Sequence, residues 1–152
     1  MSCSCGLPSR EECQELFYAS SIKEFSDFQY AKMNRLKVDA YALQHPEIYM
    51  VSAKSFAAHL VGMCIAMEYH NDQHLMKALQ KWLNGKMELE KPPILTYFGS
   101  ITIADIMKAK SASEYERFVT DWAKCVWGAY AIYHQLAREW VRLVREFDGN
   151  RL

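Results

Sequence analysis

Helix-start signals recur along the whole chain and leave little room for a sheet. In a capping box a Ser or Thr accepts from the amide three residues on, and the side chain there bonds back. Such boxes stand at residues 9–12, 26–29 and 111–114, and further cap signals stand at Ser52, Asn71 and Thr102. Only residues 94–103 could form a strand. The sequence therefore predicts an all-α fold, a helical bundle.

The predicted bundle has about five to six helices with mostly short links and a long C-terminal helix. The caps and the 3.6-residue spacing of apolar positions place the helices at about 10–24, 27–44, 53–69, 71–84, 103–109 and 113–147. Pro46 ends the second helix, because a proline disfavours helical backbone in the residue before it. Gly128 is a candidate bend in the last helix, and residues 86–100 form a long connection that contains Pro92 and Pro93.

Length and composition favour one folded unit. The chain has 152 residues, close to the usual size of a domain, and 13% of them are aromatic. Because 51% of the residues are hydrophobic, the composition excludes disorder. We expect a single helical domain over residues 1–152, in which residues 1–8 form a Cys-containing N-terminal arm.

The charge balance argues against two classes of partner. Lys plus Arg and Asp plus Glu both number 18, so the net charge is zero and no basic excess is present to bind nucleic acid or anionic membranes. The most apolar stretch, residues 56–67, is too short for a membrane span. No secretion signal is visible, so we expect a cytoplasmic protein. A neutral chain also repels itself little, which favours a homo-oligomer.

Three N-terminal cysteines are the sharpest signal for a metal. Cys3, Cys5 and Cys13 lie within eleven residues, with a glycine between them, and resemble half of a structural zinc site. The fourth ligand has to come from elsewhere, and His45 is a candidate. Cys13 falls in the first turn of a helix, where the dipole favours a thiolate. The alternative is a frayed arm whose thiols have no role.

Four polar residues are candidates for a pocket between helices: Asp39, His45, His59 and His134. His59 lies on a helix stripe of small residues, and His134 lies on a helix with aromatic residues on both faces. If Asp39 turns inward it needs a partner, and a pair with His59 or His134 would orient a ligand or a base.

Simpler explanations compete with each of these candidates. A buried histidine is usually satisfied by neighbouring groups, and His45, at a helix end, can cap free carbonyls. His70 and His74 have the i, i+4 spacing of a metal pair, but a helix start predicted between them breaks the geometry. Cys64 and Cys125 stand among apolar neighbours and are predicted to be buried, inert thiols.

Several motifs together resemble a bacterial family known only as a domain of unknown function. The likeness is carried by the box V-D-A-Y-A-L-Q-H-P at 38–46, by S-A-K-S at 52–55 with His59, and by T-I-A-D at 102–105. It continues through Trp122 and Trp127 and covers residues 5–141. The resemblance implies an intracellular helical protein and supplies no activity.

Two departures from the family pattern affect the expected metal. The family usually begins with C-P-x-C-G where this chain has Cys3-Ser4-Cys5-Gly6, and it tends to have a histidine in place of Asn34. Both differences argue against a metal in this member.

Two functions from different classes remain open. The first is a non-catalytic helical module that acts by self-association or through a protein partner and is stapled by zinc at its N-terminus. The second is a metal- or histidine-dependent enzyme or binding protein for a small molecule, with at least three of the pocket candidates around one cavity. The sequence favours the first, because it contains no phosphate loop, nucleophile elbow or other catalytic motif.

Overall fold

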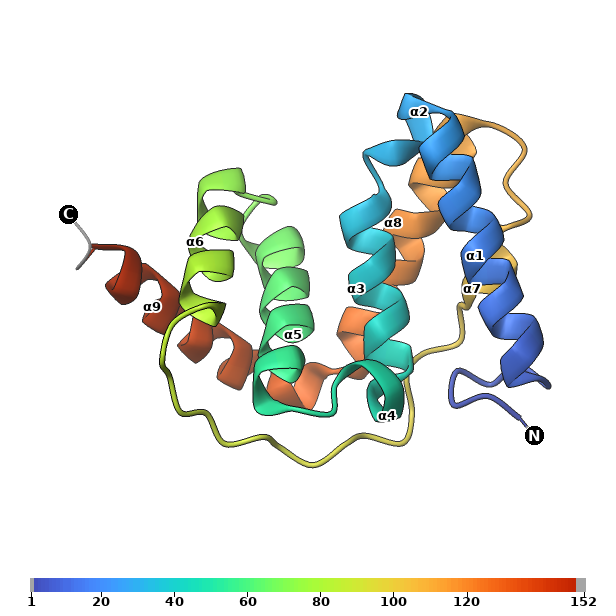
Figure 1. Ribbon diagram of the computed structural model, residues 1–152. Helices are drawn as coiled ribbons and strands as arrows, with labels where there is room; N and C mark the ends of the chain where they lie inside the picture. The colour runs from blue at the N-terminus through green and yellow to red at the C-terminus, as the bar shows by residue number, and fades with distance from the viewer. Residues whose placement is uncertain (1, 150–152) are drawn as a thin grey trace.

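The computed structural model describes residues 2–149, and every regular element within them is a helix (Figure 1). The α-helices are α1 (Arg10–Ser26), α2 (Phe28–Ala31), α3 (Asn34–Gln44), α4 (Pro46–Tyr49), α5 (Ala53–Glu68), α6 (Gln73–Leu83), α7 (Ile103–Ile106), α8 (Ala112–Ala129) and α9 (His134–Gly149). The short 3-10 helix η1 (Ala131–Tyr133) separates α8 from α9. The all-α prediction is confirmed, but the predicted number of helices is too low.

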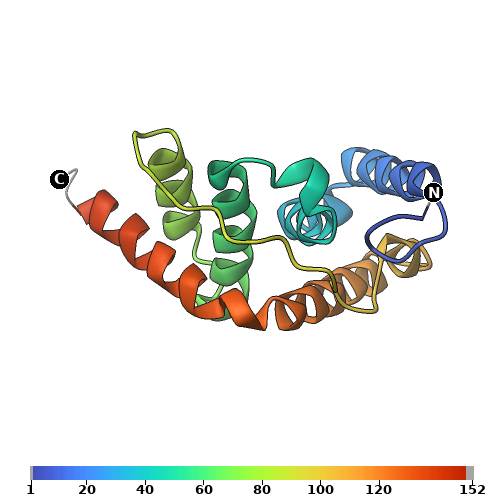
Figure 2. The ribbon, with the colours of Figure 1, turned by 90° about the horizontal axis from the view of Figure 1, so that it is seen from below.

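The helices form two layers, a row of helices and the bent path made by α8 and α9. Figure 2 shows α6, α5, α3 and α1 on one side of the continuous path made by α8 and α9. In this arrangement α3 packs on α8 and α5, while α5 packs on α6 and α9. The central helices α3 and α5 each bury more residues than any other helix of the described chain, and α1 lies at one edge of the row (Figure 1).

A C-terminal helix is present, but the single helix predicted over 113–147 is divided into α8 and α9, because the helix is interrupted at Tyr130. The buried Tyr130 hydroxyl donates to the carbonyl of Leu43 at 2.5 Å, which fixes this residue against the end of α3. The His134 Nε2–H donates to the carbonyl of Trp127 at 2.7 Å and so satisfies a carbonyl at the end of α8. The break comes two residues after Gly128, and tertiary hydrogen bonds fix it more than glycine does.

The predicted second helix is also divided. The Ser26 hydroxyl donates to the carbonyl of Ile22 and does not act as a cap, whereas Asp27 accepts from the amide of Gln29 and starts α2. A tight turn at Lys32 then leads into α3. The short helix α4 begins directly at Pro46, where a proline suits the first helical position.

Most other helix starts lie where the caps predict them. Ser9, Ser52, Thr102 and Ser111 accept from backbone amides at the starts of α1, α5, α7 and α8. The exception is α6, where Asp72 is the cap in place of Asn71. Asn71 instead has a φ of 51°, in the left-handed region that asparagine tolerates.

The connection at 86–100 is an extended strap without a strand partner. It crosses the same end of the helix row in both views (Figures 1 and 2). The Gln44 side-chain amide donates to the carbonyls of Phe98 and Ile101, at 2.9 and 2.8 Å. The sequence allowed a strand at residues 94–103, and this strand does not form in the described part of the chain.

The inward face of α1 contains buried polar groups as well as apolar ones. Its buried residues are Cys13, Ser20 and Glu24, and it meets α3 through the fully buried Lys37. The Lys37 ammonium donates to Ser20 Oγ at 3.0 Å and lies 3.0 Å from Glu24 Oε1. Burial lowers the pKa of Lys37, and the charge of Glu24 opposes this shift. Beside this polar network, Phe17 stacks on Tyr41 of α3 with ring centres 4.1 Å apart, so polar groups and apolar packing both attach α1.

No helix among residues 2–149 has both the length and the apolar character needed to cross a membrane.

Candidate metal centre

Three thiols and one imidazole converge beside the start of α1. The ligand atoms of Cys3, Cys5, Cys13 and His45 all lie within 4.8 Å of one another, and all four residues are buried. The Cys5 and Cys13 sulfurs are 3.7 Å apart, and His45 Nε2 lies 3.1 Å from Cys3 Sγ and 3.4 Å from Cys13 Sγ. Among the described residues this is the only such group of potential ligands.

Two of these three distances fit the edges of a zinc tetrahedron, and the Cys3–His45 distance is shorter. With Zn–S near 2.3 Å and Zn–N near 2.0 Å, tetrahedral ligands are roughly 3.8 Å apart for two sulfurs and roughly 3.5 Å apart for sulfur and nitrogen. The Cys5–Cys13 and Cys13–His45 distances are close to these values. Three cysteines and one histidine are also a common ligand set of structural zinc.

The backbone sets the tautomer of His45. Its Nδ1 lies 2.6 Å from the carbonyl of Tyr41, which can only accept, so Nδ1 carries the proton. The Nε2 lone pair therefore points at the thiols. A hydrogen bond of this kind to the second ring nitrogen is typical of histidines that bind metal.

The thiol pKa values show why a cation suits this site. Hydrogen bonding to Cys13, together with burial, raises the pKa of Cys5 to about 12, and burial raises the pKa of Cys3. The hydrogen bond from Cys5 lowers the pKa of Cys13. Without a cation, buried thiolates this close together would repel one another. A divalent ion would stabilise all three thiolates.

A tight turn in the N-terminal arm places Cys3 and Cys5. The amide of Cys3 donates to the carbonyl of Leu7 at 2.8 Å, and the amide of Gly6 donates to the carbonyl of Cys3 at 3.0 Å. Gly6 has a φ of 101°, a conformation that favours glycine. The Ser4 hydroxyl donates to the carbonyl of Gln44 at 2.9 Å. The arm is thus tied to the end of α3, where His45 follows.

The four pocket candidates do not converge. His45 belongs to the thiol cluster, while His134 stacks on Trp127 with ring centres 3.8 Å apart. Asp39 and His59 do meet, with His59 Nδ1 donating to Asp39 Oδ1 at 2.9 Å. The structure therefore brings together two of the four residues.

Arg35, which was not among the residues predicted from the sequence, contacts the Asp39–His59 pair. Arg35 Nε donates to Asp39 Oδ2 at 3.0 Å, and the Asp39 side chain is only 2% exposed. Gly62 makes room for the pair, because a Cβ there would lie 2.6 Å from Asp39 Oδ2 and 2.8 Å from an Arg35 nitrogen. The i, i+4 spacing of Arg35 and Asp39 was the available signal.

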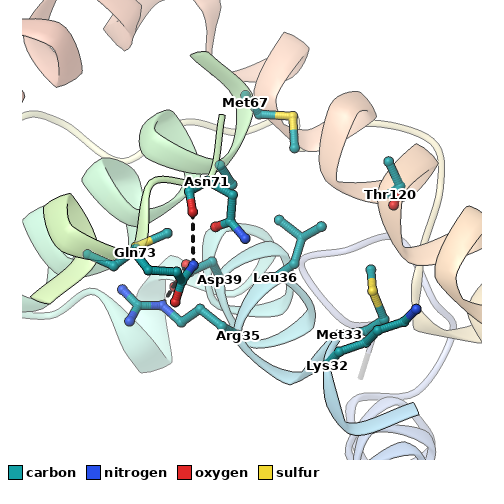
Figure 3. A pocket seen from close by; sticks show the side chains of 11 residues that line it. Lys32, Met33, Arg35, Leu36, Asp39, Met67, Asn71, Gln73 and Thr120 are labelled. Atoms are coloured by element: carbon teal, nitrogen blue, oxygen red, sulfur yellow. Dashed lines mark hydrogen bonds and ion pairs between the residues drawn. The ribbon is translucent and has the colours of Figure 1, made fainter. Parts of the chain in front are cut away.

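A cavity of about 390 Å³ adjoins this pair, between α3, the start of α6 and α8. Figure 3 shows Arg35 and Asp39 at one end and Lys32, Met33 and Thr120 at the other. The volume is within the range of small-ligand pockets. None of the five histidines lines it.

The remaining candidates have ordinary surroundings. His74 donates to Asp148 Oδ2 at 2.9 Å, and His70, with a φ of 55°, lies outside any helix, so the pair is not set for a metal. Cys64 is buried as predicted, and burial raises the pKa of its thiol to about 12. Cys125 is only partly buried.

The fold and the cluster define a helical protein with a closed set of three thiols and one imidazole. The chain matches a family of unknown function (DUF5946) over residues 1–131, and it belongs to that family. The resemblance predicted from the sequence is thereby confirmed. No curated protein and no solved structure matches the chain significantly.

Proposed function

We propose that this protein is a non-catalytic helical module in which zinc, held by Cys3, Cys5, Cys13 and His45, staples the N-terminal arm and α1 to α3. The observation that carries the proposal is the buried set of four ligand atoms within 4.8 Å of one another. Four protein ligands leave no coordination position for water or substrate, which distinguishes structural from catalytic zinc. In the cytoplasm, where we expect this protein, thiols stay reduced and able to bind metal.

The staple has a clear mechanical role. Cys3 and Cys5 come from the arm, Cys13 from α1 and His45 from the end of α3, so one ion would join three segments. α1 buries only three residues completely, against eight in α5, although Leu16 and Phe17 are half-buried against the core. Coordination would add stability at this edge of the fold, where hydrophobic burial is smaller.

The test is elemental analysis of untagged protein purified without chelator. We expect about one equivalent of zinc in the wild type, as four ligands imply, and loss of zinc in Cys5→Ser and His45→Ala. Cys125→Ser is the matched control, because it removes a thiol outside the cluster, and His59→Ala is the control for a histidine. A wild type without metal, or Cys5→Ser with full zinc content, would overturn the proposal.

A second candidate function is supported by the Arg35–Asp39–His59 arrangement. A buried carboxylate held by an arginine and a histidine beside a cavity is a common way to position a small polar ligand. Ligand-observed NMR with a fragment library would test it, comparing wild type with Ala66→Trp, which fills the cavity. Fragments that bind the wild type and not the filled variant would support a binding protein, and the absence of such fragments would dismiss it.

A further inference from the structure

The outer face of α1 and α2 exposes four large apolar side chains. Tyr18, Ile22, Phe25 and Phe28 are 62%, 67%, 91% and 84% exposed. The first three follow the i, i+4, i+7 spacing of one helical stripe, and Phe28 continues it at the start of α2. Single exposed apolar residues are ordinary, but a continuous row of four marks an interaction surface.

The same helix already has an apolar contact on its inward side. Leu16 and Phe17 pack against the core beside the buried Cys13, Ser20 and Glu24, so the inward side of α1 is occupied by its own chain. A surface helix normally presents charged and polar residues on its outer side. The outer apolar stripe of α1 is therefore not needed for contact with its own chain and is suited to a partner.

We propose that this stripe is a two-fold interface at which α1 of a second copy of this chain packs antiparallel, centred on Ile22. The proposal rests on the proposed function, because the metal fixes the helix that carries the stripe. A two-fold contact joins the same patch on both copies, so an apolar patch that includes three aromatic rings is its own complement.

The area of the stripe is sufficient for a stable contact. At about 150–250 Å² for a large side chain, four side chains with these exposures offer roughly 500–600 Å² per copy. Two copies would then bury more than about 1,000 Å², the lower bound for a specific interface. The zero net charge of the chain adds no overall repulsion between copies.

The charges along α1 favour the antiparallel direction. Exposed Glu11 and Glu15 lie toward the start of α1, while the half-buried Lys23 lies toward its end, and Lys32, which pairs with Glu116, lies beyond it. Antiparallel helices place each acidic end beside the basic end of the other copy, whereas parallel helices would place like charges together. Antiparallel packing also sets the helix dipoles in opposite directions.

The test is sedimentation velocity over a range of concentrations, with zinc content measured on the same samples. We expect the wild type to reach twice the chain mass of 17.7 kDa. Phe25→Ser should weaken the dimer at least tenfold. Ile132→Ser is the matched control, because Ile132 is 74% exposed but lies on η1. It should dimerise like the wild type.

The outcomes separate the two proposals. A zinc-loaded wild type that stays monomeric at all concentrations would overturn the proposal that a second copy packs on the stripe, and it would leave the metal proposal intact. Equal weakening by Phe25→Ser and Ile132→Ser would also overturn it. The direction is tested by salt: from about 0.05 to 0.5 M NaCl an antiparallel pair should weaken, while a parallel pair should tighten as like charges are screened.

Discussion

Helices α1 and α5 are of similar length but are held in the fold by different forces. α5 buries eight residues, and none of them carries a polar side chain other than the thiol of Cys64. α1 fully buries only Cys13, Ser20 and Glu24, while Leu16 and Phe17 are half-buried and Tyr18, Ile22 and Phe25 face outward. Hydrophobic burial stabilises α5 whether or not metal is bound, whereas α1 depends more on a buried ion pair and on a cluster suited to a metal.

The contrast shows that the stability of α1, at the edge of the protein, depends on metal and charge, whereas the stability of α5, at its centre, does not. Segments with few buried apolar contacts open at low free-energy cost, and those held by a ligand open when the ligand leaves. Metal, charge and apolar burial should therefore affect the two helices separately.

Metal removal should have the largest effect and should act on α1. After exhaustive chelation we expect amides of α1 and the N-terminal arm to exchange with solvent at least about 10⁴-fold faster, which corresponds to more than about 5 kcal/mol, while amides of α5 stay protected. Hydrogen exchange measured by mass spectrometry or NMR distinguishes the two. Equal exchange of α1 with and without chelator would contradict a metal staple.

Removal of the buried cation should come next. Lys37→Met leaves Glu24 as an uncompensated buried charge and should destabilise the protein by about 3–5 kcal/mol in urea unfolding. The double variant Lys37→Met/Glu24→Gln removes both charges and should recover most of the loss. If the double variant is no more stable than the single one, the ion pair does not hold α1 as described.

Truncation in the centre of α5 should cost slightly less. Leu60 is fully buried, and Leu60→Ala should lower the free energy of unfolding by about 2–5 kcal/mol. The matched change in α1, Leu16→Ala, removes a half-buried side chain and should cost about 1 kcal/mol. Equal losses, measured by urea denaturation, would remove the difference between the helices.

The close approach of α3 to α5 predicts a smaller loss. Gly62→Ala would press a methyl group against Asp39 and Arg35, and should destabilise by about 1–3 kcal/mol. Gly128→Ala is the control, since a Cβ there meets nothing within 4 Å, and it should be neutral or stabilise by up to about 1 kcal/mol. Thermal unfolding of the two variants decides the point, and a neutral Gly62→Ala would mean that Arg35 moves freely.

The smallest effect on the folded chain should come from the outer stripe. Phe25→Ser should change the free energy of unfolding by less than about 0.5 kcal/mol when measured at concentrations where the protein is monomeric. A loss of more than about 2 kcal/mol would show that Phe25 belongs to the core of its own chain, and the stripe would then not be a free surface.

The sequence predicted the fold well where local chemistry decides it. Ser9, Ser52, Thr102 and Ser111 mark helix starts because a cap needs only the first turn of its own helix. It failed at Tyr130, where the break depends on a hydrogen bond to Leu43, far away in the chain. The helical spacing of apolar residues carries no information about a contact between residues so far apart in the chain.

The site was predicted in part for the same reason. Cys3, Cys5 and Cys13 are close in sequence, and the sequence also offers His45 as a candidate fourth ligand. The sequence could not show that His45 joins the thiols rather than Asp39, because that depends on how the arm folds back onto α3. Arg35 was missed because solvated arginines are common on helices.

Gln44 links the candidate metal centre to a tryptophan whose fluorescence can be measured. It precedes His45, and its side-chain oxygen accepts from the indole Nε1 of the fully buried Trp122 at 3.1 Å. Any shift at the end of α3 changes the polarity and hydrogen bonding around this indole, to which tryptophan emission responds. The protein thus contains an intrinsic fluorophore beside the candidate centre, so occupancy of the centre could be followed in unlabelled protein, in real time, by the colour of its emission.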